Sequence, residues 1–114
     1  MNRLSFVVVT LAALAVPAVS LAATWERAPL VDADCSGRVK GDPDKHPITC
    51  ALKCAHSGYG VLEADGTFLP FDKAGSEKAL AALKATKKVD HLRANVTGEL
   101  KDGVIVVKSL SMVD

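Results

Sequence analysis

Aromatic residues are scarce in this chain of 114 residues, which contains one Trp, one Tyr and three Phe. Charge of one sign is also lacking, because 14 Lys and Arg stand against 13 Asp and Glu and form no basic cluster. Binding of nucleic acid or of an anionic membrane requires several phosphates to be neutralised together, and single strands also require aromatic stacking platforms. The composition therefore excludes nucleic acid as the expected partner. The few aromatic residues are expected in the core.

Long apolar runs are absent except near the N-terminus. Residues 6–16 form an almost unbroken apolar stretch, and Ser20 and Ala22 supply the small residues of a cleavage site. The stretch is shorter than the roughly 20 residues of a transmembrane helix, and no later run could act as an anchor. We expect residues 1–22 to be a signal peptide that is cleaved before Ala23. The product is expected in the periplasm or outside the cell, without a membrane anchor.

The remaining chain is small and nearly neutral. Removal of residues 1–22 leaves 92 residues with 13 basic and 13 acidic side chains. This length suits one small domain, in which only about two-thirds of the surface of the unfolded chain becomes buried. A covalent or metal cross-link would therefore help to stabilise it. We expect residues 23–114 to form a single domain.

Two hairpins are predicted by dipeptides that favour tight turns. Asp65-Gly66 joins the runs 60–63 and 67–71, and Asp102-Gly103 joins the runs 92–100 and 104–112. Alternation in the third of these runs predicts one buried face, made by Leu92, Ala94, Val96 and Leu100. Before the hairpins, the stretch from residue 25 to 41 reads as irregular apart from a short first strand over residues 30–35.

Two helices complete the predicted order of elements. One runs from Pro47 to about His56 and ends at Gly58, because glycine adopts positive φ without strain. The other runs from Ser76, its expected cap, to about Lys87, and its apolar face is made by Ala79, Leu80 and Leu83. Strand, short helix, hairpin, helix and hairpin is the order typical of a mostly β fold, a small five-stranded OB-like barrel. The cysteine-containing helix is then an insertion after the first strand.

All the cysteines and two of the three histidines lie within 22 residues. These are Cys35, His46, Cys50, Cys54 and His56. In an oxidising compartment three cysteines cannot all pair within one chain. The favoured hypothesis is a disulfide from Cys35 to Cys50 or Cys54, which closes a loop of about 15 to 20 residues and contributes roughly 3 kcal/mol. The third thiol is then available for an intermolecular disulfide.

A metal site is the alternative hypothesis for the same residues. On a helix Cys50 and Cys54 lie on one face with roughly 6 Å between their Cα atoms, which suits two thiolates on one ion. Cys35, together with His46 or His56, could complete a Cys3His set for copper or zinc. A thiol redox role is disfavoured, because neither C-x-x-C nor a thioredoxin-like order of elements is present.

Other side chains give weaker indications of function. The loop aspartates lack the glycine and terminal glutamate of a calcium loop, and we expect them to cap turns: Asp32, Asp34, Asp42 and Asp44. His91 is expected to be solvated. No Ser-His-Asp ordering, phosphate loop or pair of catalytic carboxylates stands out, so the chain is not expected to be an enzyme.

One longer pattern covers most of the domain. It comprises Asp32-x-x-Cys35, His46, Cys50-x3-Cys54 and Gly58, followed by Val96-Thr97-Gly98 before the closing strand. This pattern resembles a group of small exported bacterial proteins of unknown function, and their closing segment resembles bacterial OB-type domains. The resemblance implies an exported small barrel with a Cys/His segment and no assigned reaction. We therefore expect a small exported binding or structural domain, with a periplasmic copper or zinc binding protein as the alternative.

Overall fold

The computed structural model describes residues 21–113, so nearly all of the expected signal peptide lies outside the described residues. Within this part of the chain the strands are β1 (Leu21–Asp32), β2 (Tyr59–Leu62), β3 (Phe68–Pro70), β4 (Arg93–Lys101) and β5 (Val104–Met112). The helices are α1 (Ile48–Lys53) and α2 (Lys73–Ala85). No helix in residues 21–113 is both long and apolar enough to cross a membrane.

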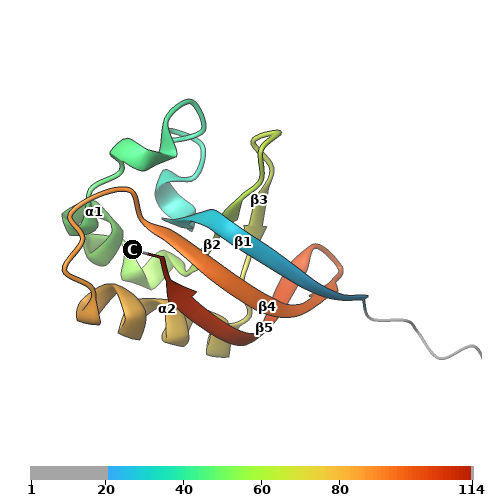
Figure 1. Cartoon of the computed structure of the whole chain (residues 1–114). Helices are drawn as coiled ribbons and strands as arrows, with labels where there is room; N and C mark the ends of the chain where they lie inside the picture. Colours follow the sequence, from blue (N-terminus) through green and yellow to red (C-terminus); the bar gives the residue numbers. More distant parts are fainter. Residues whose placement is uncertain (1–20, 114) are drawn as a thin grey trace, which may run out of the picture.

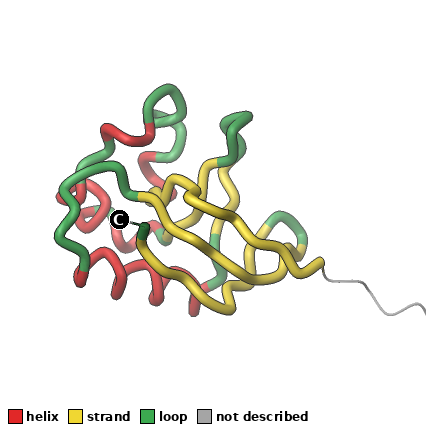
Figure 2. Tube along the Cα trace, viewed as in Figure 1, coloured by secondary structure: helices red, strands yellow, loops and turns green. Residues whose placement is uncertain are grey.

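The strands form one curled sheet in the order β3-β2-β1-β4-β5, and every neighbouring pair is antiparallel. A parallel bridge between Phe71, just after β3, and Ile105 in β5 brings the two edges of the sheet together. The sheet therefore curls into a half-barrel, with α1 and α2 grouped at one side of it (Figures 1 and 2). The predicted mostly β, OB-like barrel with two short helices is confirmed.

Strand β1 is much longer than the sequence predicted. Residues 25–29 belong to it rather than to an irregular stretch. Residues 30–32 are strand as expected, whereas residues 33–35 form a 3-10 turn rather than the end of a strand. A bulge between Trp25 and Ala28, where Arg27 has φ +49, interrupts its pairing with β4. The strand is central and bulged, so its sequence lacks the simple alternation by which strands are recognised.

Both hairpins lie where the turn dipeptides placed them, but one core residue was predicted wrongly. Leu92, Ala94 and Val96 are buried as expected, whereas Leu100 is 37% exposed. The register of β4 against β5 shifts between Thr97 and Gly98. Ile105, which pairs with Leu100, is nevertheless fully buried, so the core reaches this end of the hairpin through β5.

The helices are shorter or capped differently from the prediction. Pro47 precedes α1, which ends at Lys53, and a separate 3-10 turn over residues 55–57 ends at Gly58 with φ +80. Helix α2 is capped by Asp72 rather than Ser76. The Ser76 hydroxyl instead accepts a hydrogen bond from the backbone N–H of Tyr59 at 3.1 Å, which ties α2 to β2.

The core is made by the concave face of the sheet and the buried side of α2. Ala79 and Leu83 of α2 are buried against it, as the helical pattern predicted. Tyr59 and Phe71 are buried as well, as expected of the aromatic residues, whereas Phe68 is only partly buried. The segment between β1 and β2 contributes Ala51 to this core and carries all the predicted site residues.

The different roles of β4 and its turn can be tested with two substitutions. Val96 is fully buried, so Val96→Asp should cost several kcal/mol of unfolding free energy by placing an unpaired charge in the core. Lys101 is exposed, and Lys101→Ala should change stability by no more than about 0.5 kcal/mol. Urea unfolding measures both, and equal stability of the two variants would contradict the assigned core face.

Candidate functional site

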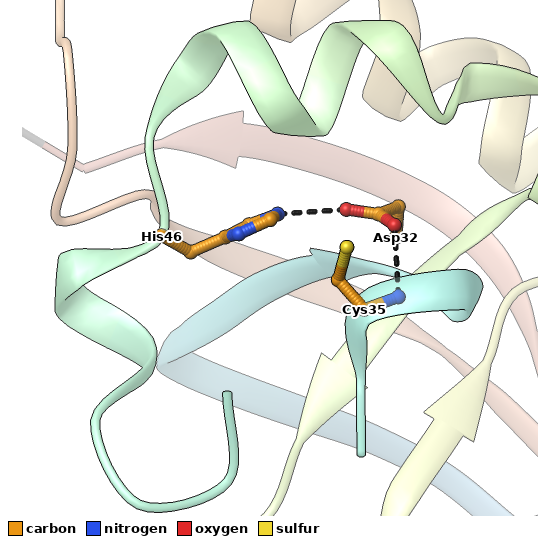
Figure 3. Close-up of side chains that lie close together, drawn as sticks. All are labelled: Asp32, Cys35 and His46. Carbon is orange, nitrogen blue, oxygen red and sulfur yellow. Dashed lines mark hydrogen bonds and ion pairs between the residues drawn. The ribbon is translucent and has the colours of Figure 1, made fainter. Parts of the chain in front are cut away.

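The candidate site is built around the carboxylate of Asp32, the last residue of β1. This side chain is completely buried, and its residue pairs with Tyr59 in β2. Oδ1 lies 2.7 Å from Nε2 of His46, and Oδ2 accepts a hydrogen bond from the backbone N–H of Cys35 at 3.0 Å (Figure 3). Burial of a charge is costly without such partners, so these two contacts are what makes the buried carboxylate tolerable.

Cys35 is held by the 3-10 turn that Asp32 caps. The backbone N–H of Ala33 donates to the Gly58 carbonyl at 2.9 Å, which fixes the turn against the segment that follows α1. The Cys35 thiol is buried, and its pKa is raised above the usual value by burial and by the neighbouring Asp32 carboxylate. The Arg38 guanidinium opposes this rise, because it donates to the sulfur at 3.3 Å.

His46 is turned inward by anchors on both sides of it. Asp44 accepts two hydrogen bonds from the Arg93 guanidinium, at 2.9 and 3.1 Å, which hold the pKa of this carboxyl below its usual value. The N–H of Ile48 donates to the Val89 carbonyl at 2.8 Å. The segment on either side of His46 is thus tied to residues that precede or begin β4, and His46 is 5% exposed.

A buried tyrosine links α1 to the same region. The Tyr59 hydroxyl donates to the Ala51 carbonyl at 2.7 Å. Its pKa is raised to about 12, first by burial and then by the charges of Asp32 and Cys54. The hydroxyl therefore remains protonated at neutral pH and holds α1 against β2.

The three side chains present ligand atoms of three kinds within a small space. The Cys35 sulfur, an imidazole nitrogen of His46 and a carboxylate oxygen of Asp32 all lie within 4.8 Å of one another. Ligand atoms around a tetrahedral ion with bonds of 2.0–2.3 Å are roughly 3.3–3.8 Å apart. To reach that geometry, the distance from Oδ1 of Asp32 to Nε2 of His46 would lengthen from 2.7 Å by about 0.6 Å. The widest separation between any two of the three ligand atoms would shorten by at most about 1.5 Å.

Of the five residues predicted as metal ligands, the cluster contains Cys35 and His46. Cys50 is exposed, Cys54 is partly buried, and the exposed His56 lies 3.2 Å from the carboxylate of Asp34. A single Cys3His site is therefore not what the described residues form. The expectation that Asp32 caps a turn is confirmed, but it missed the second role of this carboxylate as the partner of His46. The Asp-x-x-Cys spacing was the sequence signal that could have indicated it.

The predicted disulfide has no counterpart in the structure. All three cysteines are free thiols, and only Cys35 is buried. A disulfide from Cys35 to Cys50 or Cys54 thus remains a prediction, as does an intermolecular one. His91 is exposed as expected, although it precedes β4 and has φ +49.

Comparisons with models of protein families, with curated proteins and with solved structures found no match to this chain.

Proposed function

We propose that this protein is a small exported domain that binds one divalent metal ion, and that it binds zinc in preference to other metals. The observation that carries the proposal is the buried convergence of Asp32, Cys35 and His46, whose ligand atoms lie within 4.8 Å of one another. Two separate segments contribute to it, and each is fixed by backbone hydrogen bonds outside the cluster. A ligand set held in this way needs little reorganisation to accept an ion.

The kinds of ligand atom favour zinc. Zinc accepts thiolate sulfur, imidazole nitrogen and carboxylate oxygen, whereas calcium and magnesium select oxygen and Cu(I) selects sulfur. Copper, the other metal that the sequence suggested, is therefore less suited to this cluster. Three protein ligands leave the fourth tetrahedral position to a water molecule or to a group from a partner.

The hydrogen bonds of the cluster indicate which atom each residue would offer. Oδ2 of Asp32 is held by the N–H of Cys35, so Oδ1, which faces His46, is the atom available to an ion. The proton that His46 Nε2 and Asp32 Oδ1 share would be released to solvent, and so would the proton of the Cys35 thiol, so that all three atoms could bind the ion. The guanidinium of Arg38, 3.3 Å from the sulfur, would stabilise the thiolate.

The surroundings of Cys35 support binding rather than nucleophilic catalysis. Reactive cysteines are partly exposed and have a lowered pKa, whereas Cys35 is 7% exposed and its pKa is raised. Location in the periplasm or outside the cell is part of the proposal and rests on the signal-peptide pattern of residues 1–22.

The ligand assignment is tested by zinc competition with a chromophoric chelator. Asp32→Asn, Cys35→Ser and His46→Gln should each lower zinc affinity by about 100-fold or more, since each removes a direct ligand. His56→Gln is the matched control, because His56 is an exposed histidine outside the cluster, and it should bind zinc like the wild type. Undiminished zinc binding by His46→Gln would contradict the assignment.

Zinc should also stabilise the fold. At a free concentration of 100 times its Kd, an ion that binds only the native state adds about 2.7 kcal/mol to the unfolding free energy. Urea unfolding with zinc and with a chelator measures this difference. His46→Gln should show almost none of it, and a wild-type protein equally stable with and without zinc would count against the site.

The anchor that positions His46 can be tested without removing a ligand. Arg93→Gln breaks the two hydrogen bonds to Asp44 and should lower zinc affinity by about 10-fold, because the histidine loop becomes less constrained. Lys45→Gln removes an exposed ion pair with Asp42 in the same loop, at 3.4 Å, and should leave the affinity unchanged. Equal affinities of the two variants would show that the anchor does not position His46.

A further inference from the structure

The end of α1 carries two thiols that the buried cluster does not use. Cys50 lies in α1 and Cys54 is its C-cap. The N–H of Cys54 donates to the carbonyl of Cys50 at 3.2 Å, so the two residues are one helical turn apart. Both are free, Cys50 is exposed, and Cys54 is partly accessible. A ligand can therefore reach them from solvent.

The helical spacing favours a bridging ion over a disulfide between the two. Residues four apart on a helix have Cβ atoms about 5–6 Å apart on the same face. A disulfide requires Cβ atoms about 3.5–4.5 Å apart, closer than the helix places them. Two metal–sulfur bonds of about 2.3 Å allow the sulfurs to be up to about 4.6 Å apart, whereas a disulfide holds them about 2 Å apart. A bridging ion therefore fits the wider spacing of the two Cβ atoms.

We infer that Cys50 and Cys54 form a surface site for one soft monovalent metal ion, Cu(I), distinct from the Asp32, Cys35 and His46 cluster. Two thiolates without a nitrogen or oxygen ligand select a soft ion. On binding, both S–H groups release their protons to solvent and two copper–sulfur bonds form, while copper stays Cu(I) and no electron is transferred. The bound unit carries one negative charge, and Lys53, the charged residue of α1, lies next to it in sequence.

The site is independent of the proposed zinc function. It uses neither the buried carboxylate nor the imidazole, and among the described residues Cys50 and Cys54 belong to no group of three or more ligands. The two sites also differ in accessibility, because the ligands of the cluster are buried and Cys50 is exposed. Failure of one proposal therefore leaves the other open to its own test.

The test is anaerobic competition for Cu(I), supplied as its bicinchoninate complex, with the fully reduced protein. The wild type should take one equivalent from the chelator. Cys50→Ser and Cys54→Ser should each lower the affinity by about 100-fold, because one thiolate alone holds the ion poorly. Cys35→Ser and His46→Gln should retain wild-type affinity, and circular dichroism checks that each variant is folded.

A positional control keeps the number of thiols constant. Thr49→Cys in the Cys50→Ser background moves one thiol by a single residue, off the face that Cys54 occupies, and should not restore copper binding. Restoration by this double variant would overturn the inference, as would unchanged affinity of Cys50→Ser. A loss in Cys35→Ser equal to that in Cys50→Ser would place the ion in the buried cluster and also overturn it.

Discussion

The buried carboxylate of Asp32 is the interaction on which the rest of the site depends. It ends the central strand, caps the turn that carries Cys35, and meets the imidazole of His46 at 2.7 Å. Removal of one hydrogen-bond partner leaves a buried polar group unsatisfied, which costs about 1–3 kcal/mol and more for a charged group. The chain from residue 33 to 46 is therefore constrained at both ends by one side chain. A metal ion would replace part of this hydrogen bonding without moving the backbone far.

Most of the core and most of the candidate ligands come from different parts of the chain. The curled sheet and α2 supply most of the core, whereas all three cysteines and two of the three histidines lie in the insertion between β1 and β2. The barrel nevertheless positions the insertion, because Arg93 of β4 holds Asp44 and the Tyr59 hydroxyl of β2 holds α1. The insertion brings a mixed ligand set together in the interior and leaves a pair of thiols at the surface. These two arrangements suit ions of different softness.

Features with local causes were predictable from the sequence. Asp65-Gly66 and Asp102-Gly103 specify their turns by themselves, and Gly58 ends its segment because it tolerates positive φ. Contacts between distant residues were not predictable. The bulge in β1 depends on pairing with β4, about 70 residues away. The Asp-x-x-Cys spacing distinguishes Asp32 from the other loop aspartates, but its burial against His46 results from the docking of a loop and is not visible in the local sequence.

The central claim is that one sulfur, one nitrogen and one carboxylate oxygen of this chain surround a zinc ion at Asp32. X-ray absorption spectroscopy at the zinc edge of protein loaded with one equivalent measures this most directly. The account predicts one sulfur at about 2.3 Å together with nitrogen and oxygen ligands at about 2.0–2.2 Å. Two or more sulfurs in the first shell would instead place zinc on the cysteines of α1. A shell without sulfur would remove Cys35 from the site, and either result would contradict the account.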